Sequence, residues 1–392
     1  MTDLAATADL RDLVRELRDT EFPWTAATTY LNNASIGPIP ERTRLALEAF
    51  NAKRTAPHLL PDRERFAEIR AVREHAARLI GADPGEIALM PNTTMGVNVA
   101  ARALPLEAGA VVLVSDREFP ANVYPWLALA DEGITTELVP VTSRGWPDED
   151  RIVERLADPK VRALAVSFVQ FANGYQADLA RLSAGCRANG VTFVVDAIQG
   201  LGAAPLDVRQ TPVDVLATGG QKWLLSPWGT GFLYVRQELI ASMAPAYVGW
   251  MSYEGTDDFT NLVDYADRLL GDARRFEVGT LTFQDQLGMR VSLGLLLELG
   301  IENIARYTQA LADPLLAWCD EHEVRVTSPR DPPHRSSIVC IAPPDAGDVF
   351  HQLKRAGVVC ALREGSIRLS PHCYNTPDEI GRVIEVLETA IR

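Results

Sequence analysis

The sequence of 392 residues lacks a long apolar run, an excess of positive charge and a closely spaced set of cysteines. Apolar residues make up 47% of the chain, yet no stretch approaches the ~20 apolar residues that a membrane helix needs. The net charge of −14 disfavours nucleic acid and anionic membranes as partners, because both attract positively charged surfaces. Charged residues recur every few positions near the start of the chain, which argues against a signal peptide. These absences leave a cytoplasmic enzyme as the default prediction.

Cysteine and lysine are both scarce. The five cysteines stand far apart without a C-x-x-C pair, so we expect neither a disulfide framework nor a structural metal site. Only four of the 38 basic residues are lysine, and arginine cannot replace lysine where a neutral amine must act as a nucleophile. Each lysine is therefore a candidate for chemistry: Lys53, Lys160, Lys222 and Lys354.

Short apolar runs alternate with helical or Gly/Pro-rich stretches between residues 86 and 235, which is typical of strands buried on both faces of a mainly parallel sheet. Apolar residues at helical spacing predict a helix in residues 1–20 and one long helix over 284–312. Residues 240–282 are predicted to be irregular, and 324–392 to form a small α+β unit. The predicted strands of the sheet are 86–90, 110–115, 135–141, 162–168, 191–195, 214–218 and 231–235.

Polar residues stand at three strand ends, where sheets of this kind bind their ligands. Thr93 and Thr94 open a helix, and their hydroxyls and free N–H groups suit a phosphate, although an ordinary helix cap explains them as well. Asp196 ends a fully apolar strand, where burial is costly unless a cation such as a protonated pyridine nitrogen meets the carboxylate. The alternative for Asp196 is an N-cap of the following segment.

Lys222 follows another strand, in GGQKWLLSPWG, with no acid within seven residues on either side. Desolvation in such surroundings lowers the pKa of an amine and makes it a usable nucleophile. A lysine that reaches the surface from an apolar loop is the alternative, but it does not explain the flanking glycines. A lysine for a Schiff base, an acid for a pyridinium nitrogen and hydroxyls for a phosphate together match the requirements of pyridoxal 5'-phosphate.

The chain also resembles the fold-type I pyridoxal-phosphate enzymes called class V aminotransferases, which include cysteine desulfurases, kynureninases and isopenicillin N epimerase. The resemblance runs from about residue 29 to 385, nearly the whole chain. It is carried by segments that stand in the family's order: YLNNASIGP, NTTMGVN, REFPANVYPW, VVDAIQGLGAAPLDV, GGQKWLLSPWGTGFLYV, RRFEVGT and SIRLSPHCYNT.

The resemblance implies an α/β fold of the pyridoxal-phosphate-dependent transferase type. A large cofactor-binding domain with a mainly parallel seven-stranded sheet would span residues 26–283, and a linking helix with a small C-terminal α+β domain would span 284–392. Residues 1–25 would form an N-terminal helical segment that packs with the small domain. A homodimer with shared active sites is also implied, because Thr280 in FEVGT would reach the phosphate held by the neighbouring subunit.

The family pattern also assigns roles around the cofactor. Lys222 would form the Schiff base and then shuttle the α-proton, while Asp196 would pair with the pyridine nitrogen and keep the ring an electron sink. The other cofactor contacts would come from Thr93, Thr94 and Gln221 at the phosphate, Gln199 at the ring oxygen, Phe119 stacked on the ring and Asn122 beside it.

On the substrate side, the resemblance implies that Arg368 clamps the α-carboxylate of an amino acid in a bidentate fork. Asn32, in YLNNASIGP, would also contact the substrate. His372, Tyr374 and Asn375 would fix the strand and loop that carry Arg368. No metal is implied.

The chain departs from the desulfurase pattern at several positions. Gln221 and Phe119 stand where desulfurases usually place histidines. A desulfurase also needs a cysteine nucleophile on a mobile loop upstream of the carboxylate-binding arginine. Cys360 lies instead in the apolar stretch GVVCAL, and Cys373 has no loop around it, so we expect both to be structural.

The leading prediction is a class V aminotransferase that acts on an α-amino acid, with a keto acid as the second substrate. A cysteine desulfurase or C–S lyase is the second alternative, and an epimerase of the isopenicillin N type is the third. A catalytically silent binding protein of the same fold is disfavoured by the intact set of Lys222, Asp196 and Arg368. A nicotinamide-dependent dehydrogenase needs a G-x-G-x-x-G turn after its first strand, which NTTMGVN does not supply.

Overall fold

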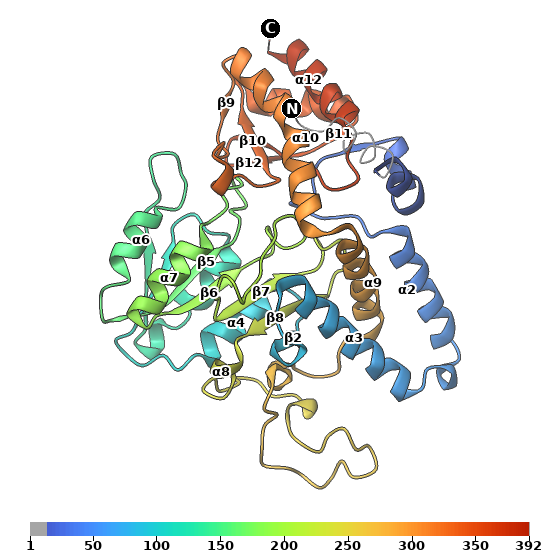
Figure 1. The fold of residues 1–392 in the computed structure, drawn as a ribbon, viewed down its shortest axis with the longest axis vertical. Coiled ribbons are helices and arrows are strands. Elements are labelled where there is room, and N and C mark those ends of the chain that lie inside the picture. The colour runs from blue at the N-terminus through green and yellow to red at the C-terminus, as the bar shows by residue number, and fades with distance from the viewer. Residues whose placement is uncertain (1–13, 392) are drawn as a thin grey trace.

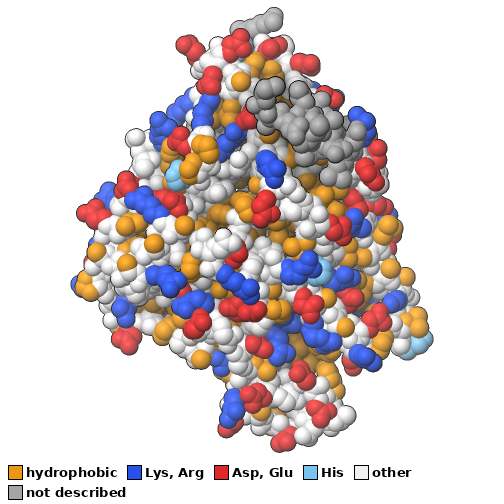
Figure 2. All heavy atoms as spheres, viewed as in Figure 1, with side chains coloured by type: hydrophobic (Ala, Val, Ile, Leu, Met, Phe, Trp, Pro, Cys, Tyr) orange, Lys and Arg blue, Asp and Glu red, His pale blue; other side chains and the backbone are white. Residues whose placement is uncertain are grey.

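The computed structural model describes residues 14–391. The predicted helix over residues 1–20 lies partly outside the described residues, and the chain is helical from residue 14 to 21. Within the described part of the chain, no helix is both long and apolar enough to cross a membrane. Acidic and basic side chains are interspersed over the face shown in Figure 2, without a broad surface of one charge.

A seven-stranded sheet lies at the centre of the molecule, with the strand order β2-β8-β7-β6-β5-β3-β4. Most neighbouring strands are parallel, whereas β8 runs antiparallel to both of its neighbours. All seven predicted apolar runs form strands of this sheet, so the prediction of a mainly parallel sheet is confirmed. The strands are β2 (Ile87–Leu89), β3 (Val111–Ser115), β4 (Thr135–Val139), β5 (Val161–Ser167), β6 (Thr192–Asp196), β7 (Val215–Gly219) and β8 (Gly231–Val235).

Successive strand residues face two different apolar layers, one on each side of the sheet. In β6, Phe193 and Val195 pack into the layer that contains residues of α3, α7 and α9, whereas Val194 packs into the layer that contains α4 and Trp126. Because both faces are covered, the central strands carry apolar side chains at most positions, whereas the edge strand β4 is mostly exposed or half-buried. The helices around the sheet are α2 (Glu41–Arg54), α3 (Asp62–Ile80), α4 (Thr93–Ala103), α5 (Tyr124–Leu127), α6 (Glu149–Arg155), α7 (Leu179–Asn189), α8 (Gln237–Ile240) and α9 (Phe283–Leu299).

The prediction of one long helix over 284–312 is wrong, because two helices occupy this stretch. Helix α9 ends at Gly300, and α10 (Ile301–Glu321) begins directly after it. Gly300 has a φ of 79°, a conformation that glycine adopts without a steric penalty and that interrupts an α-helix. Helix α9 packs against α2 and α3, whereas α10 packs against α12 (Pro377–Ala390), so the break carries the chain from the large sheet to a second unit.

The second unit is built on a four-stranded antiparallel sheet with the order β12-β13-β10-β9, which lies above the large sheet in Figure 1. It confirms the small α+β unit predicted for residues 324–392. A short parallel pair of β1 with β11 links the start of the described chain to this unit. The elements are β1 (Thr29–Tyr30), β9 (Arg325–Val326), β10 (Val339–Ala342), α11 (Ala346–Arg355), β11 (Val358–Val359), β12 (Ala361–Arg363) and β13 (Ser366–Leu369).

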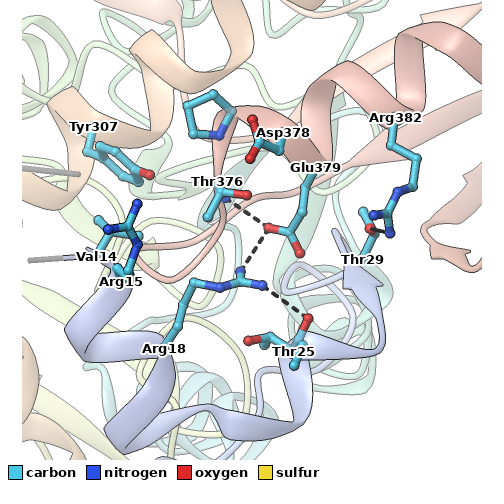
Figure 3. A pocket seen from close by; sticks show the side chains of 12 residues that line it. Val14, Arg15, Arg18, Thr25, Thr29, Tyr307, Thr376, Asp378, Glu379 and Arg382 are labelled. Carbon is cyan, nitrogen blue, oxygen red and sulfur yellow. Dashed lines mark hydrogen bonds and ion pairs between the residues drawn. The ribbon is translucent and has the colours of Figure 1, made fainter. Parts of the chain in front are cut away.

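The N-terminal helical residues 14–21 are tied to the same unit through Arg18. Its guanidinium donates to the carbonyl oxygen of Tyr374 at 2.6 Å, to Oε2 of Glu379 at 3.0 Å and to the carbonyl oxygen of Thr25 at 3.0 Å. Figure 3 shows Arg18 reaching between Thr25 and Glu379 on the wall of a pocket beside α12. The domain boundaries themselves stay a prediction.

Candidate active site

Lys222 lies just beyond the end of β7, on a turn that is closely packed by the segment around Gly37. The backbone N–H of Gly37 donates to the carbonyl oxygen of Gln221 at 2.9 Å. A Cβ atom at residue 37 would lie only 2.0 Å from the carbonyl oxygen of Lys222, so this position requires glycine. The turn that carries the lysine is therefore held by backbone contacts from the segment between β1 and α2.

The amine of Lys222 is desolvated and close to an aromatic face. Its Nζ lies 5.6 Å from the centroid of the Phe119 ring. Burial lowers the pKa of Lys222 to about 8, the positive charges of Arg368 and Arg363 also lower it, and the carboxylate of Asp196 opposes the shift. A substantial fraction of the amine is therefore neutral near physiological pH.

Asp196 ends β6 and is buried at the same edge of the sheet. Its Oδ1 accepts a hydrogen bond from the backbone N–H of Ile198 at 3.0 Å, so it does cap the following turn. Burial raises the pKa of Asp196 to about 6, against the lowering effects of that hydrogen bond and of Lys222. A cationic partner would favour the charged carboxylate.

The start of α4 forms a small cradle with the loop before Lys222. The hydroxyl of Thr93 is buried and has no hydrogen-bond partner, whereas Thr94 is exposed. A Cβ atom at Gly219 would lie 2.5 Å from Oε1 of Gln221 and 3.3 Å from Oγ1 of Thr93, so both side chains surround this glycine. Asn92, rather than a threonine, caps the helix, because its Oδ1 accepts from the backbone N–H of Met95 at 2.9 Å. The hydroxyl of Thr93 is thus left for a ligand.

Phe119 and Asn122 lie on the loop after β3. The Phe119 ring is 44% exposed, and its edge-to-face partner is Phe171 at 5.3 Å between centroids. Asn122 is fully buried, yet neither Oδ1 nor Nδ2 has a partner. An unpaired buried amide is costly, roughly 1–3 kcal/mol per group, which indicates a ligand-facing side chain.

Gln199 is engaged by other parts of the protein. Its Nε2 donates to the carbonyl oxygen of Ala34 at 3.0 Å, and its Oε1 accepts from Nε1 of Trp223 at 2.8 Å. The side chain thereby connects the turn after β6 to the Lys222 loop, and one hydrogen of its amide remains for another acceptor.

Arg368 projects from β13 of the small sheet toward the large sheet. Its Nη1 donates to the carbonyl oxygen of Phe171 and its Nη2 to Oγ of Ser35, both at 2.8 Å. Its Nε is buried without a partner, and burial lowers the pKa of Arg368 to about 10. A buried guanidinium without a carboxylate partner among the described residues is well suited to bind an anion. Sequence reasoning missed Ser35 and Phe171, which carry no signal of their own.

Asn32 lies beside this arginine, where it bridges to Ser370, and its Oδ1 is buried and unpaired. His372 donates from Nε2 to the carbonyl oxygen of Trp223 at 3.0 Å, and burial lowers its pKa to about 4. Tyr374 donates to Oδ1 of Asn33 at 2.9 Å, and Asn375 donates to the carbonyl oxygen of Tyr30 at 2.9 Å. These bonds hold the segment after β13 against the Lys222 loop and the segment after β1.

Glu118 is a second buried acid that sequence reasoning missed. Its carboxylate accepts from the backbone N–H of Ser167 and from Nε2 of Gln170, both at 2.7 Å, and from the hydroxyl of Ser167. Burial raises the pKa of Glu118 to about 7, with a smaller contribution from the nearby charge of Asp196 and against the lowering effect of the hydrogen bonds from Ser167 and Gln170. Glu118 thereby holds the loop that carries Phe171.

Thr280 forms no hydrogen bond with Lys222, Asp196 or Arg368 among the described residues. It is exposed on the segment between η7 (Ala273–Phe276) and α9, where it lines a separate pocket with Phe283. Its predicted role concerns a neighbouring subunit and stays a prediction.

The cysteines are all buried and free. Burial raises the pKa of Cys360 to about 12 and also raises that of Cys373, which makes both thiols poor nucleophiles. Among the described residues, no group of His, Cys, Asp or Glu side chains is arranged to hold a metal ion.

The arrangement fits pyridoxal phosphate. The amine of Lys222 lies in the field of a buried carboxylate, an exposed phenyl face lies beside it, and an unpaired hydroxyl stands at the start of a helix. These groups match a carbonyl carbon, a flat cationic ring and a phosphate, respectively.

Comparisons with known proteins agree with this fit. The family model described as aminotransferase class-V matches residues 29–383. The chain is 30% identical to the uncharacterized aminotransferase YcbU of Bacillus subtilis (strain 168), over 82% of this chain and 84% of that protein. It is also 30% identical to the isopenicillin N epimerase of Streptomyces clavuligerus, over 91% and 94% of the two chains.

A probable cysteine desulfurase of Methanothermobacter thermautotrophicus is 28% identical over 97% of each chain. Among solved structures, the cysteine desulfurase from Thermococcus onnurineus NA1 superposes with a TM-score of 0.86 at 23% identity, over 96% of this chain and 98% of that one. At 23% identity, this structural similarity shows that the two chains share a fold.

Proposed function

The chain belongs to the class-V aminotransferase family, with pyridoxal 5'-phosphate as its cofactor, and from this premise we propose that it is an aminotransferase of α-amino acids. The observation that carries the proposal is the desolvated amine of Lys222, which lies in the electrostatic range of both the buried Asp196 carboxylate and the buried Arg368 guanidinium. A base and an anion-binding group on the same site are what proton removal from the α-carbon of an amino acid requires.

We assign the cofactor contacts by chemistry. Lys222 would attach the cofactor covalently, Asp196 would hold the ring nitrogen, and Thr93 with Gln221 would hold the phosphate at the start of α4. Phe119 and Asn122 would face the ring, and Gln199 has one amide hydrogen left for the ring oxygen. Thr94, at the same helix start, offers backbone and hydroxyl donors on the exposed side. When bound, pyridoxal phosphate supplies an electron sink that stabilises negative charge on the substrate's α-carbon.

Arg368 would bind and orient the substrate through its α-carboxylate. Its two bonds to Phe171 and Ser35 fix the plane of the guanidinium before substrate arrives, which lowers the entropy cost of binding. Asn32, with its unpaired Oδ1, would accept from the substrate nearby.

Lys222 would move the proton. With a pKa lowered to about 8, the neutral amine is available near physiological pH and remains basic enough to take a proton from a carbon activated by the electron sink. The same amine would then deliver the proton on the same face to an atom other than the α-carbon, as amino-group transfer requires, because returning it to the α-carbon would only regenerate the amino acid.

The surroundings of Lys222 support transamination over the alternatives. A cysteine desulfurase needs an accessible thiolate, and all five cysteines are buried. Epimerisation by two opposed proton carriers needs a second titrating group across from Lys222, but the side facing the amine carries the phenyl ring of Phe119. We therefore place cysteine desulfurase and epimerase activity behind transamination, and the experiment below separates transamination from C–S lyase activity.

We further propose a cytoplasmic homodimer with shared active sites. Thr280 is exposed and lines a pocket that does not include Lys222 of its own chain, which leaves it open to a neighbouring subunit. The irregular segment before it exposes large apolar side chains, among them Tyr247 at 66%, Val263 at 77% and Tyr265 at 86%, which a subunit interface would cover.

A half-reaction experiment tests the proposed reaction. Holoenzyme is mixed with single amino acids in the absence of any keto acid, and products are quantified by mass spectrometry. An aminotransferase releases one keto acid per active site and then stops. Continued release of sulfide or ammonia would establish a lyase, and formation of the opposite enantiomer would establish an epimerase; either result would overturn the proposal.

A further inference from the structure

A cleft of about 480 Å³ lies between the two sheets, next to the candidate active site. The loops after β3, β4 and β5 line it on one side, and β9 and the β12–β13 turn line it on the other. The lining includes Arg117 and Arg144 from the large-sheet side and Arg325 from the small sheet. An acidic protein, with 52 acidic and 38 basic residues, thus places several arginines around one cleft.

The cleft adjoins the α-carboxylate site through Phe171. This residue lines the cleft, its carbonyl oxygen accepts from Arg368 at 2.8 Å, and its ring contacts Phe119. Phe119 in turn faces the amine of Lys222 at 5.6 Å. A substrate bound by Arg368 would therefore have the cleft directly beside it.

The register of the small sheet puts further arginines on the same face as Arg368. Arg363 on β12 pairs with Ser366, which lies two residues before Arg368 on β13. On the other side of β13, Arg368 pairs with Cys340 of β10. Two residues further along β10, Ala342 pairs with Arg325 of β9. Because directly paired residues share a face, and residues two apart on a strand also share it, all three arginines point the same way. That face meets the large-sheet side, since Sγ of Cys340 donates to the carbonyl oxygen of Ala172.

The distance along the strand suits a small bifunctional molecule. Two residues of an antiparallel strand span about 7 Å and neighbouring strands lie about 5 Å apart, so the backbone of Arg363, one strand away, is ~8 Å from that of Arg368, and the backbone of Arg325, two strands away, is ~12 Å from it. An anion a few carbons away from an α-carboxylate held by Arg368 would reach this second row of arginines.

These arginines are available to a ligand. Within residues 14–391, Arg117, Arg144, Arg325 and Arg363 form no ion pair; Arg144 lies over the Trp146 ring, and Arg363 donates to the carbonyl oxygen of Leu362. The acids of the cleft do not neutralise them. Asp116 accepts from the backbone N–H of Arg117, Glu118 is bonded to Ser167 and Gln170, and Glu364 is exposed without an ion pair.

We propose that this cleft binds a second carboxylate, carried by the substrate's side chain, so that the enzyme acts on dicarboxylic α-amino acids. The inference rests on the proposed function, because it assumes that the α-carboxylate binds at Arg368. Guanidinium groups from both sides of the cleft bind the distal carboxylate, whereas a neutral amide of the same shape has no negative charge and only one acceptor oxygen to offer them.

Binding of non-reactive analogues tests the inference. The α-methyl forms of glutamate and glutamine have no α-proton to lose, so calorimetric titration of the holoenzyme measures their dissociation constants without turnover. We expect the glutamate analogue to bind at least about tenfold more tightly than the glutamine analogue, as for hydrogen bonds to charged groups. Raising the salt concentration to about 0.5 M should reduce this preference, because the arginines are exposed.

Variants then locate the effect. Arg325→Ala and Arg144→Ala should each reduce the preference about three- to tenfold while leaving the affinity for the glutamine analogue unchanged, which also shows that the site is intact. Arg355→Ala is the matched control, since this exposed arginine of α11 removes the same charge elsewhere on the small unit.

Two different failures can be told apart. Equal affinities for the two analogues, or a preference that survives both variants, would overturn this inference and leave the proposed function standing. If neither analogue binds the holoenzyme, nor do small neutral amino acids, the proposed function fails with it.

Discussion

The buried carboxyl group of Glu118 should make the stability of the protein depend on pH. Burial raises its pKa from the ordinary value of 4.5 to about 7, and the charge of Asp196 adds to the rise, while the bonds from Ser167 and Gln170 oppose it. No arginine or lysine among the described residues is paired with this carboxylate. Removing its proton therefore leaves a buried negative charge that is hydrogen-bonded but has no cationic partner in that part of the chain.

The sign and size of the effect follow from linkage. The folded protein binds this proton more tightly than the unfolded chain, so the stabilisation is complete below pH 4.5 and is lost as the pH rises to about 7. One pKa unit corresponds to about 1.4 kcal/mol, so the shift corresponds to a loss of ~3 kcal/mol, as an upper value for a fully buried group.

Glu118→Gln removes the titration and keeps the shape of the side chain. Urea unfolding of the apoenzyme, followed by circular dichroism at pH 5 and pH 8, gives the free energy of unfolding for the wild type and the variant. We expect the variant to gain about 2–3 kcal/mol relative to the wild type between these two pH values. Glu364→Gln, which removes a carboxylate from the exposed turn between β12 and β13, serves as the control and should show no such gain.

The comparison concerns the change in the free energy of unfolding between pH 5 and pH 8. When this change for the wild type is subtracted from that for the variant, the contributions of all titrating groups that the substitution does not affect cancel. A free-energy difference between wild type and Glu118→Gln that stays constant from pH 5 to pH 8 would refute this reasoning. It would mean that water or a relaxed loop solvates the carboxylate in the folded protein.

Four further predictions concern the candidate active site. Lys222→Ala should abolish both turnover and the visible absorbance of bound cofactor, and retention of both would contradict its assignment. In wild-type apoenzyme, the rate of covalent cofactor attachment should rise with pH and level off above about 8, because the neutral amine reacts; a rate independent of pH between 6 and 9 would contradict the lowered pKa. Arg368→Gln should raise KM for amino acids roughly 100-fold through loss of charge-assisted bonds and leave the cofactor absorbance unchanged; loss of cofactor instead would argue against a carboxylate site. Cys360→Ala should leave kcat/KM within about twofold of wild type, since the thiol is buried, and complete loss of activity would favour a desulfurase.

The sequence determined the elements of the fold and the chemistry-bearing residues at their ends. The central strands of the large sheet are nearly continuous apolar runs, because both of their faces are covered, and that signal is local; the edge strand β4, TTELV, is the exception. Asp196 and Lys222 stood out for a related reason, since a charged residue in apolar surroundings is costly unless it has a task. The length of the helix after residue 283 was mispredicted, because its apolar spacing continues past Gly300 while the backbone does not.

Only the tertiary structure decided how these residues meet. Arg368 is oriented by Ser35 and Phe171, which stand 333 and 197 residues away in sequence. The carboxylate of Glu118 is held by Ser167 and Gln170, which stand 49 and 52 residues away. The arginines of the cleft come from the loops after β3 and β4 and from strands of the small sheet. Hydrogen bonding and electrostatic fields act over a few ångströms of space regardless of the chain between. Local sequence patterns therefore predict which side chains of a segment are buried. The way the two sheets pack against each other determines which side chains lie in the same site.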